Sequence, residues 1–171
     1  MTRINLVDPS LEVIKSLNNK LVDSYISRSH LIKIHYKRGQ EIVLDLEKKI
    51  VFIAGMGGKE IQEIMKCLLP QLSPADRVVI SPHRNILELR KYLNCSEFKL
   101  IDEVTVFEDG QYYQVLCLET SIGLPQVSIY GHKVWQGLVG EEYRQHQIRA
   151  FSLHQDDASK AYVAHLGQLS H

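Results

Sequence analysis

Residues 49–58 read Lys-Ile-Val-Phe-Ile-Ala-Gly-Met-Gly-Gly, and this stretch decides the fold. The run from Lys49 to Ala54 is apolar and rich in β-branched residues, which is typical of a strand covered by helices on both faces. The glycine cluster of residues 55–58 ends the strand. The residues after it repeat apolar side chains at helical spacing until Pro70, where a helix should stop. Strand, glycine turn and helix in this order indicate an α/β protein.

The flanking segments continue the alternation of strands and helices. Residues 4–7 form a short apolar run, and a helical pattern begins at Leu11. Residues 31–37 alternate strictly between apolar and polar, as an edge strand with one wet face does. Another apolar strand at residues 77–80 precedes a helical pattern at 86–93. The order of these elements predicts a mostly parallel sheet.

The pattern changes after residue 97. Residues 98–107 and 112–118 are two strand-like runs joined at Glu108-Asp109-Gly110, and Asp-Gly between such runs is a strong hairpin signal. The parallel sheet should therefore end in an antiparallel hairpin. Residues 121–134 have the composition of a loop, and residues 135–169 have helical spacing.

Length and composition suit one domain with a tail. The chain has 171 residues, of which 44% are hydrophobic and 23% charged, enough for one core. We expect an α/β domain over residues 1–120 and a loop with a helical tail over 121–171. Lys plus Arg equals Asp plus Glu at 20 each, so any binding of nucleic acid must come from a local patch.

Several classes of protein and site lack support in the sequence. There is no signal-peptide pattern and no apolar run of membrane-spanning length, so we expect a cytoplasmic protein. Three widely spaced cysteines fit a reducing compartment, and we interpret all three as packing residues. The eight histidines show no ligand spacing, so we expect no metal site. The absence of a Walker motif or nucleophile elbow argues against an NTPase or hydrolase.

Ligands of open parallel sheets bind beyond the carboxyl ends of the strands, and several strand ends here carry suggestive residues. Asp8 follows the first strand, where a carboxylate can accept hydrogen bonds from a ribose diol. Asp-Pro-Ser is also good helix-capping chemistry, and the two roles are compatible. The Gly55 to Gly58 turn either lets a ligand approach the backbone or is simply a tight turn between strand and helix.

Three further segments are weaker candidates. Gln40, in the turn Arg38-Gly39-Gln40, has an amide that can read an adenine edge, although the residue types favour a solvated turn. His83 follows the strand at 77–80 and suits acid-base work near neutral pH. The stretch from Arg28 to Lys37 has no acidic residue and carries Lys33, so it is our candidate for phosphate contacts; charge on an edge strand also prevents aggregation.

Taken in order, five pieces of the chain resemble the TrmK family of bacterial tRNA adenine-N1 methyltransferases. The most specific is Ile53-Ala-Gly-Met-Gly-Gly, followed later by a Leu-Arg-x-x-Leu helix from Leu89 and by the Glu-rich hairpin with Tyr113. The agreement in order and spacing covers about two thirds of the chain, and the pieces are as follows: VDPS, the RGQ turn, VFIAGMGGKEI, VVISPH with LELRKYL, and FKLIDEVTVFEDGQYYQVL.

The resemblance implies a Rossmann-like methyltransferase fold and methyl transfer from S-adenosylmethionine to N1 of a tRNA adenine. Asp8 would take the cofactor ribose, Gly39 and Gln40 would flank its adenine, and the residues from Ala54 to Gly58, Met56 included, would line the cleft. Tyr112, Tyr113 or His83 would stack on the target base or orient it. The phosphate contacts would come from Lys33, Lys37 and Arg38.

This sequence departs from the family at its start. Family members begin with a strand and an Asp-x-x-x-Asp-His-Gly type of loop for the methionine part of the cofactor, and nothing before Ile4 supplies one. That strand would lie between those at residues 4–7 and 49–54, so we expect two unpaired edges. Three explanations for the missing strand are open. The start codon is wrongly assigned and the protein is longer, or the sheet closes up without this strand, or the chain is a decayed or partner-dependent remnant. We favour the first. A non-catalytic Rossmann-like module that binds RNA, nucleotide or protein is the rival function, and the oligomeric state is open.

Overall fold

The computed structural model describes residues 4–24, 32–45, 47–120, 127–154 and 156–169. The chain divides into two compact units. The first consists of Met1–Leu44 with Ile64–Gln71, and the second of Asp45–Glu63 with Leu72–His171. The domain boundary that the sequence suggests at residue 120 stays a prediction.

The first unit is built on a parallel pair of strands. β1 (Ile4–Asp8) is followed by α1 (Leu11–Ser24) and β2 (Ile32–Tyr36), and the register runs from Ile4 opposite Ile32 to Asp8 opposite Tyr36. The expected strand, helix and strand are confirmed. Among the described residues β2 pairs only with β1, as an edge strand does. Arg28, in the expected basic stretch, lies outside the described residues.

The end of α2 also belongs to the first unit. α2 (Gly58–Leu68) is followed by a 3-10 turn, η3 (Leu69–Gln71), so the expected stop near Pro70 is confirmed. The Gln71 amide Nε2 donates to the carbonyl of Ile42 at 3.1 Å, and its Oε1 accepts from the Leu44 N–H at 2.9 Å. These two bonds hold the segment after the 3-10 turn η2 (Gly39–Glu41) against the end of α2.

The second unit contains a mixed four-stranded sheet. Its strands are β3 (Ile50–Met56), β4 (Arg77–Pro82), β5 (Phe98–Glu108) and β6 (Gln111–Thr120), in the order β3-β4-β6-β5. The β3–β4 pair is parallel, and β6 runs antiparallel to both of its neighbours. The predicted hairpin is confirmed. Its turn residues Asp109 and Gly110 have φ of 50° and 79°, the conformation that an Asp-Gly turn favours.

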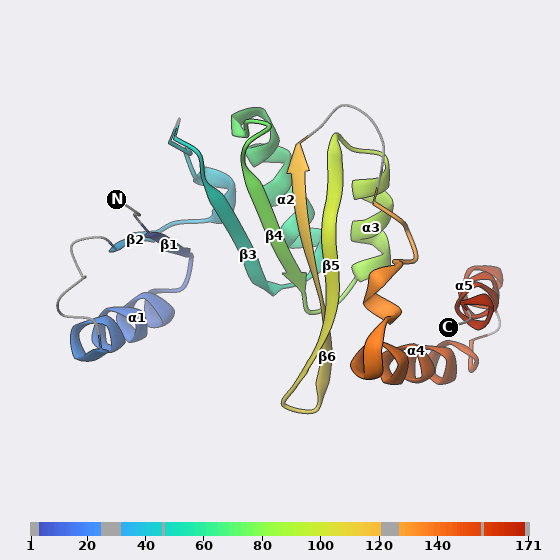
Figure 1. Ribbon diagram of the computed structural model, residues 1–171. Helices are drawn as coiled ribbons and strands as arrows, with labels where there is room; N and C mark the ends of the chain where they lie inside the picture. The colour runs from blue at the N-terminus through green and yellow to red at the C-terminus, as the bar shows by residue number, and fades with distance from the viewer. Residues whose placement is uncertain (1–3, 25–31, 46, 121–126, 155, 170–171) are drawn as a thin grey trace. The chain divides into compact units, whose positions relative to one another are not determined.

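Helices cover one face of this sheet. The first part of α2 and α3 (Ile86–Asn94) lie behind the strands in Figure 1. Alternate residues of β4 and β6 point toward these helices and are buried there. The buried apolar side chains shared between sheet and helices are Ile61, Val78, Ile80, Leu89, Leu93, Leu116 and Leu118.

The opposite face of the sheet is uncovered within the described residues. Ile53 is 5% exposed, but its neighbour Phe52 is 72% exposed and Ala54 is also exposed. The prediction that this strand is covered on both faces is therefore wrong. An uninterrupted apolar run shows that both faces can be buried, but it does not supply the element that buries the second.

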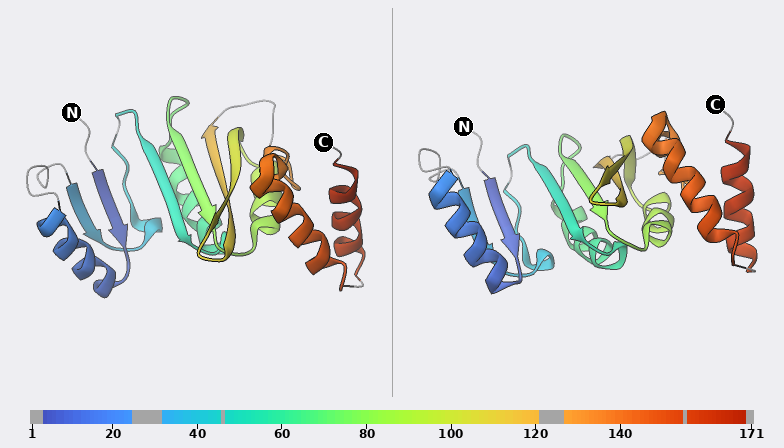
Figure 2. Two further views of the ribbon diagram at one scale, coloured as in Figure 1. Left: turned by 60° about the horizontal axis from the view of Figure 1, so that its bottom comes forward. Right: turned by 90° about the horizontal axis from the view of Figure 1, so that it is seen from below.

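Two helices follow the sheet. A 3-10 turn, η4 (Lys133–Trp135), leads into α4 (Gly137–Phe151), and α5 (Asp157–Gln168) lies beside α4 in both views of Figure 2. The helical tail is confirmed, with a break between the helices where Asp156 caps α5 by accepting from the Ser159 N–H. The expected loop lies partly outside the described residues, at 121–126. An aromatic core joins these elements, formed by Val134, Trp135, Tyr143, Tyr162 and Leu166.

A buried ionic network fastens the segment before α4 to the sheet. Arg90 Nη2 on α3 donates to Glu103 Oε2 on β5 at 2.7 Å, and its Nη1 donates to the Ser128 carbonyl at 2.9 Å. Glu103 Oε1 accepts from the backbone N–H groups of His132 and Lys133. The network therefore ties the chain after the hairpin to both a helix and a strand.

The three cysteines differ in burial. Cys67 and Cys95 are exposed, so the interpretation of these two as packing residues is wrong, and Cys117 is half-buried. Cysteine type alone does not reveal which side of a helix faces solvent.

Among the described helices, none combines the length and the apolar composition needed to cross a membrane.

Candidate functional site

The carboxyl ends of β3 and β4 come together in the second unit. The His83 N–H donates to the carbonyl of Met56 at 2.9 Å, and the Gly58 N–H donates to the carbonyl of Arg84 at 2.8 Å. These two bonds join the turn after β3 to the turn after β4. The edge predicted from the order of strands therefore exists, with the glycine turn and His83 on it.

The glycines of this turn differ in what surrounds them. Gly55 has φ of 81°, and no atom lies within 4 Å of the position that a Cβ would take. A Cβ on Gly58 would lie 2.5 Å from the Asn85 carbonyl oxygen, whereas the three atoms nearest to one on Gly57 would be side-chain atoms of Glu60 and Arg84. Gly58 thus allows two backbones to pack closely, while Gly55 leaves open space at the end of the strand.

Ala54 and Met56 complete the predicted set at this strand end. Both belong to β3, where Ala54 is exposed and Met56 is half-buried. The register with β4 shifts between them, so the strand is irregular where it reaches the glycines. Such irregularities re-aim side chains at the rims of sheets.

A polar hollow of about 310 Å³ lies beside the turn and is lined by Lys59, Glu60, Arg84 and Asn85. Our sequence reasoning did not single out these residues. The signal was available, because each directly follows a predicted strand end or glycine turn. Arg84 Nη2 lies 3.7 Å from Glu60 Oε1, and both side chains are largely exposed. The hollow therefore has two cations, Lys59 and Arg84, and one carboxylate.

His83 and Tyr113 meet at the same edge. Their ring centroids are 5.3 Å apart, and the Tyr113 hydroxyl donates to Gln111 Oε1 at 3.2 Å. Because β6 is antiparallel to β4, the beginning of β6 lies next to the end of β4. The structure thus brings together two of the three residues expected to stack on the target base or orient it.

Tyr112 points elsewhere. Its ring lies 4.7 Å from that of Phe107 and 5.1 Å from that of Tyr143, with His146 at 5.7 Å. These contacts place Tyr112 in the packing between the hairpin and α4. Its predicted stacking on a substrate base stays a prediction, and any such base would have to compete with these rings.

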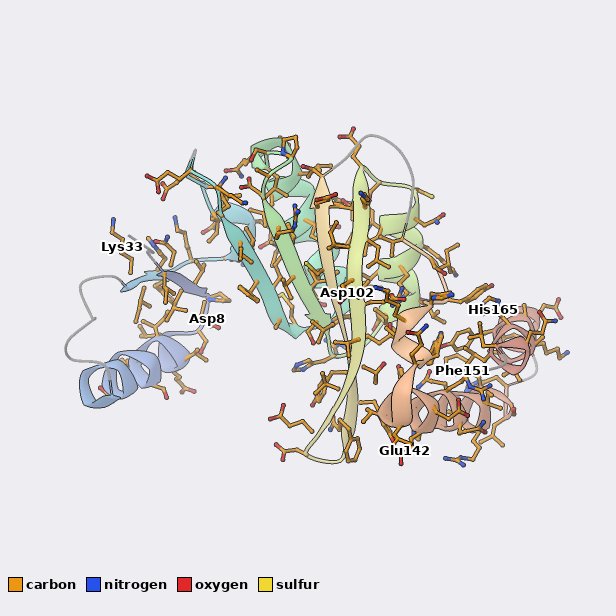
Figure 3. All side chains as sticks on the ribbon, in the orientation of Figure 1. Asp8, Lys33, Asp102, Glu142, Phe151 and His165 are labelled. Atoms are coloured by element: carbon orange, nitrogen blue, oxygen red, sulfur yellow. The ribbon has the colours of Figure 1, made fainter. Side chains whose placement is uncertain are left out.

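In the first unit, Asp8 lies at the end of β1 (Figure 3). Its Oδ1 accepts from the Ser10 N–H at 2.7 Å, which is the capping role expected for Asp-Pro-Ser. Within the described part of the chain, Oδ2 has no hydrogen-bond partner. One oxygen therefore orders the turn, and the other can accept from a ligand.

The turn after β2 carries three predicted residues. The Arg38 N–H donates to Glu41 Oε2 at 3.3 Å, which closes the turn, and Gln40 is exposed. A Cβ on Gly39 would lie 2.6 Å from Cδ1 of Ile64. A side chain at position 39 would therefore displace the Ile64 side chain on α2, whatever Gly39 does toward a ligand.

The predicted phosphate contacts lie on and after β2. Lys33 is exposed on the strand, and Figure 3 shows it on the same small sheet as Asp8. Lys37 is half-exposed, and its N–H donates to the Asp8 carbonyl at 3.2 Å. His35 shares the face of Lys33, but its Nε2 is 3.0 Å from Asn5 Oδ1. Lys33 and Arg38 offer exposed cations in the first unit.

Sequence comparison finds relatives among tRNA methyltransferases. The chain is 33% identical over 88 residues to the tRNA (adenine(22)-N(1))-methyltransferase of Bacillus subtilis (strain 168), a match that covers 52% of this chain and 37% of the relative. It is 33% identical over 76 residues to a Mycoplasma pneumoniae protein, covering 44% of this chain and 34% of that protein. The chain thus spans less than two fifths of the length of these curated relatives.

Solved structures share the fold across nearly the whole chain. The Streptococcus pneumoniae protein Sp1610 superimposes with a TM-score of 0.81 at 17% identity, covering 99% of this chain and 82% of that one. Mycoplasma capricolum TrmK, solved with S-adenosyl-homocysteine, gives a TM-score of 0.71 at 18% identity, with 97% and 76% coverage. The chain therefore has a Rossmann-like methyltransferase fold with a helical C-terminal end.

A family model described as a methyltransferase domain matches residues 4–116. The matched region contains β1 with Asp8, the glycine turn after β3, and the His83–Tyr113 pair. It therefore includes the strand-end residues of both units. Because the match spans more than half of the 171 residues, the chain belongs to the methyltransferase domain family.

Proposed function

We propose that the protein binds S-adenosylmethionine and transfers its methyl group to N1 of an adenine in tRNA. The observation that carries the proposal is the open space over Gly55, at φ of 81°, directly before α2. Only a glycine adopts this backbone readily, and its missing side chain leaves room for a ligand at the strand end. The similarity to tRNA adenine-N1 methyltransferases supports this choice of reaction.

We assign three groups of residues to the cofactor. We assign the ribose hydroxyls to Asp8, whose Oδ2 has no hydrogen-bond partner among the described residues. Gly39 and Gln40 are assigned to the adenine, and the residues from Ala54 to Gly58 to the cleft for methyl transfer. We assign no residue to the methionine moiety.

Methyl transfer to adenine N1 depends more on the alignment of the reactants than on acid-base groups of the protein. Bound S-adenosylmethionine supplies an electrophilic methyl group. Adenine N1 is unprotonated near neutral pH, so its lone pair can attack a carbon that is correctly aligned. We assign the orientation of the target base to His83 and Tyr113, whose rings are already in contact.

RNA must be held by local charge, because the chain has equal numbers of acidic and basic residues. Lys59 and Arg84 provide two cations at the β3 and β4 ends, and Lys33, Lys37 and Arg38 provide others in the first unit. We propose these residues as contacts to the phosphate backbone. With tRNA as substrate, we expect the protein to act in the cytoplasm.

Calorimetric titration with S-adenosylhomocysteine tests the cofactor site first. We expect micromolar binding by the chain, and roughly tenfold weaker binding by Asp8→Asn, which keeps the capping oxygen but loses the charge. Asp157→Asn, at an exposed carboxylate on α5, is the matched control and should bind like the parent chain. Equal affinity in all three proteins would remove Asp8 from the site.

Methyl transfer is then measured by incubating the chain with S-adenosylmethionine and tRNA transcripts and detecting 1-methyladenosine in the digested RNA. A product that disappears when the target adenine is replaced supports the proposed reaction. Cofactor binding without any product would identify a non-catalytic module. Absence of both would overturn the proposed function.

A further inference from the structure

The polar hollow beside the glycine turn lies within the second unit and has the size of a small binding site. Its volume is about 310 Å³, and its lining residues are Lys59, Glu60, Arg84 and Asn85. Pockets for small ligands have volumes from about 300 Å³ upward, so the hollow has room for a phosphate group with its sugar. Two cations and one carboxylate give the lining a net positive charge. The hollow therefore suits an anion.

The lining comes from the starts of two helices. Lys59 and Glu60 belong to the first turn of α2, and Asn85 is the N-cap of α3, where its side chain makes no capping hydrogen bond. The Gly58 N–H donates to the Arg84 carbonyl at 2.8 Å and fastens the two starts together. The positive ends of both helices thus add to the charge of Lys59 and Arg84.

The carboxylate of the hollow forms a weak pair. Arg84 Nη2 and Glu60 Oε1 are 3.7 Å apart, and the two side chains are 73% and 52% exposed. Exposed ion pairs contribute little, whereas a guanidinium can donate two parallel hydrogen bonds to a phosphate. A phosphate can therefore displace Glu60 from Arg84.

The hollow adjoins the residues that we assign to methyl transfer. A Cβ on Gly57 would lie 2.9 Å from Arg84 Nε and 2.6 Å from Glu60 Oε2, so the glycine turn borders the hollow. Arg84 directly follows His83, whose ring centroid is 5.3 Å from that of Tyr113. A single ribose joins the base and the phosphate of a nucleotide, so the groups that recognise them must be close neighbours. The ring pair and the hollow meet this requirement.

We propose that the hollow binds a phosphate of the target nucleotide itself, with Arg84 and Lys59 as the recognising cations and Glu60 as a competing carboxylate. The inference rests on the proposed function, because it takes the base at His83 and Tyr113 as the target adenine. It goes beyond general attraction of the RNA backbone, since one phosphate receives a defined site. The consequence is a specificity: the site discriminates a nucleotide from its nucleoside.

Adenosine 3′,5′-bisphosphate and adenosine test this specificity, because the first carries both phosphates that flank a nucleotide in RNA and the second carries none. The isotope-labelled chain, saturated with S-adenosylhomocysteine, is titrated with each compound and followed by NMR. The bisphosphate should bind about tenfold more tightly and should shift the backbone amide signals of Lys59, Glu60, Arg84 and Asn85. Equal affinities for the two compounds would overturn the proposal.

Arg84→Gln tests the main cation. This variant should bind the bisphosphate about tenfold more weakly and adenosine with unchanged affinity, because it loses the charge and keeps a polar side chain. Arg149→Gln, at an exposed cation on α4, is the matched control and should bind both compounds like the parent chain. An equal loss for both compounds in Arg84→Gln would show that Arg84 does not recognise the phosphate.

Glu60→Gln gives a change of opposite sign. It removes the carboxylate that competes for Arg84, so the bisphosphate should bind about threefold more tightly. Glu142→Gln, at an exposed carboxylate on α4 (Figure 3), is the control and should leave the affinity unchanged. Unchanged or weaker binding by Glu60→Gln would overturn the competing role of this carboxylate.

Failure of the phosphate site and failure of the proposed function give different results. If the parent chain and Arg84→Gln form 1-methyladenosine in tRNA with the same rate and KM, the reaction stands and the phosphate site is overturned. If no methyl transfer occurs, but the bisphosphate still shifts the four amide signals and Arg84→Gln abolishes these shifts, the phosphate site stands and the proposed reaction is overturned.

Discussion

Arg90 and Glu103 form a buried ion pair in which Nη2 and Oε2 are 2.7 Å apart and the side chains are 1% and 0% exposed. Arg90 also donates to Gln114 Oε1, and Glu103 also accepts from two backbone N–H groups. Nearly every polar atom of the pair thus has a partner. Removing one member leaves the other charged and buried without compensation.

Glu103→Gln should therefore lower the free energy of unfolding by about 3 to 5 kcal/mol. Trp135, the single tryptophan, follows the fastened segment and is 6% exposed, so its fluorescence in a urea titration reports the loss directly. Asp102→Asn, in the exposed pair with Lys133, is the control and should leave the midpoint unchanged. Similar midpoints for all three proteins would refute a stabilising network.

Asp76 should make stability depend on pH in the acid range. Burial alone would raise its pKa, but hydrogen bonds from Lys49 and Ser73 lower the pKa from 3.8 to about 2. Its contribution is thus complete above the unfolded pKa near 3.8 and is lost as the pH falls toward 2, a change of roughly 2 kcal/mol. Asp76→Asn should flatten the stability curve over this interval, as measured by urea unfolding, and curves that stay parallel would contradict the assignment.

Gly57 and Gly58 should respond differently to alanine. In Gly58→Ala the new Cβ would lie 2.5 Å from a backbone oxygen of Asn85, which should cost about 1 to 3 kcal/mol of stability. In Gly57→Ala the three nearest atoms belong to the exposed side chains of Glu60 and Arg84, which can move, so the free energy of unfolding should stay within about 0.5 kcal/mol of that of the parent chain. If the turn lines the cleft, Gly57→Ala should nevertheless reduce methyl transfer, and full activity would make the glycine cluster a simple bend.

Tyr112 and Tyr113 are neighbours with separate roles. Tyr112→Ala removes contacts with Phe107 and Tyr143 and should lower stability by about 2 to 3 kcal/mol. Tyr113→Ala loses mainly its contact with His83 and should cost less than about 1 kcal/mol, but it should reduce the rate of methyl transfer. Chemical denaturation and initial rates separate the two variants, and a fully active Tyr113→Ala would remove that ring from the site.

The periodicity of the sequence predicted the elements because each has a local cause. Asp109-Gly110 adopts the backbone of a tight hairpin, and the glycines after Ala54 end β3 as expected. The exposed face of Phe52 was not predictable, since an apolar run does not state what covers it. Arg90 has apolar neighbours along its helix, and its partner Glu103 lies on another element, a contact that no local pattern reveals.

The sequence predicted part of the candidate site. Strand ends indicated Asp8, the glycine turn and His83, because the position of a residue after a strand can be read from the sequence. The directions of the other side chains depend on packing between elements. Tyr112 and Tyr113 are adjacent in sequence, yet only the fold directs one toward α4 and the other toward His83.

The two sheets share no strand within the described residues, so we expect the protein to open as two cooperative units of unequal stability. A pair of strands with one helix is marginally stable alone, whereas four strands backed by helices resist opening. Amide hydrogens of β1 and β2 should therefore exchange with solvent sooner than those of β4 and β6. Asp8 lies in the unit that we expect to open more often, so a ligand bound there would stabilise the less stable of the two units.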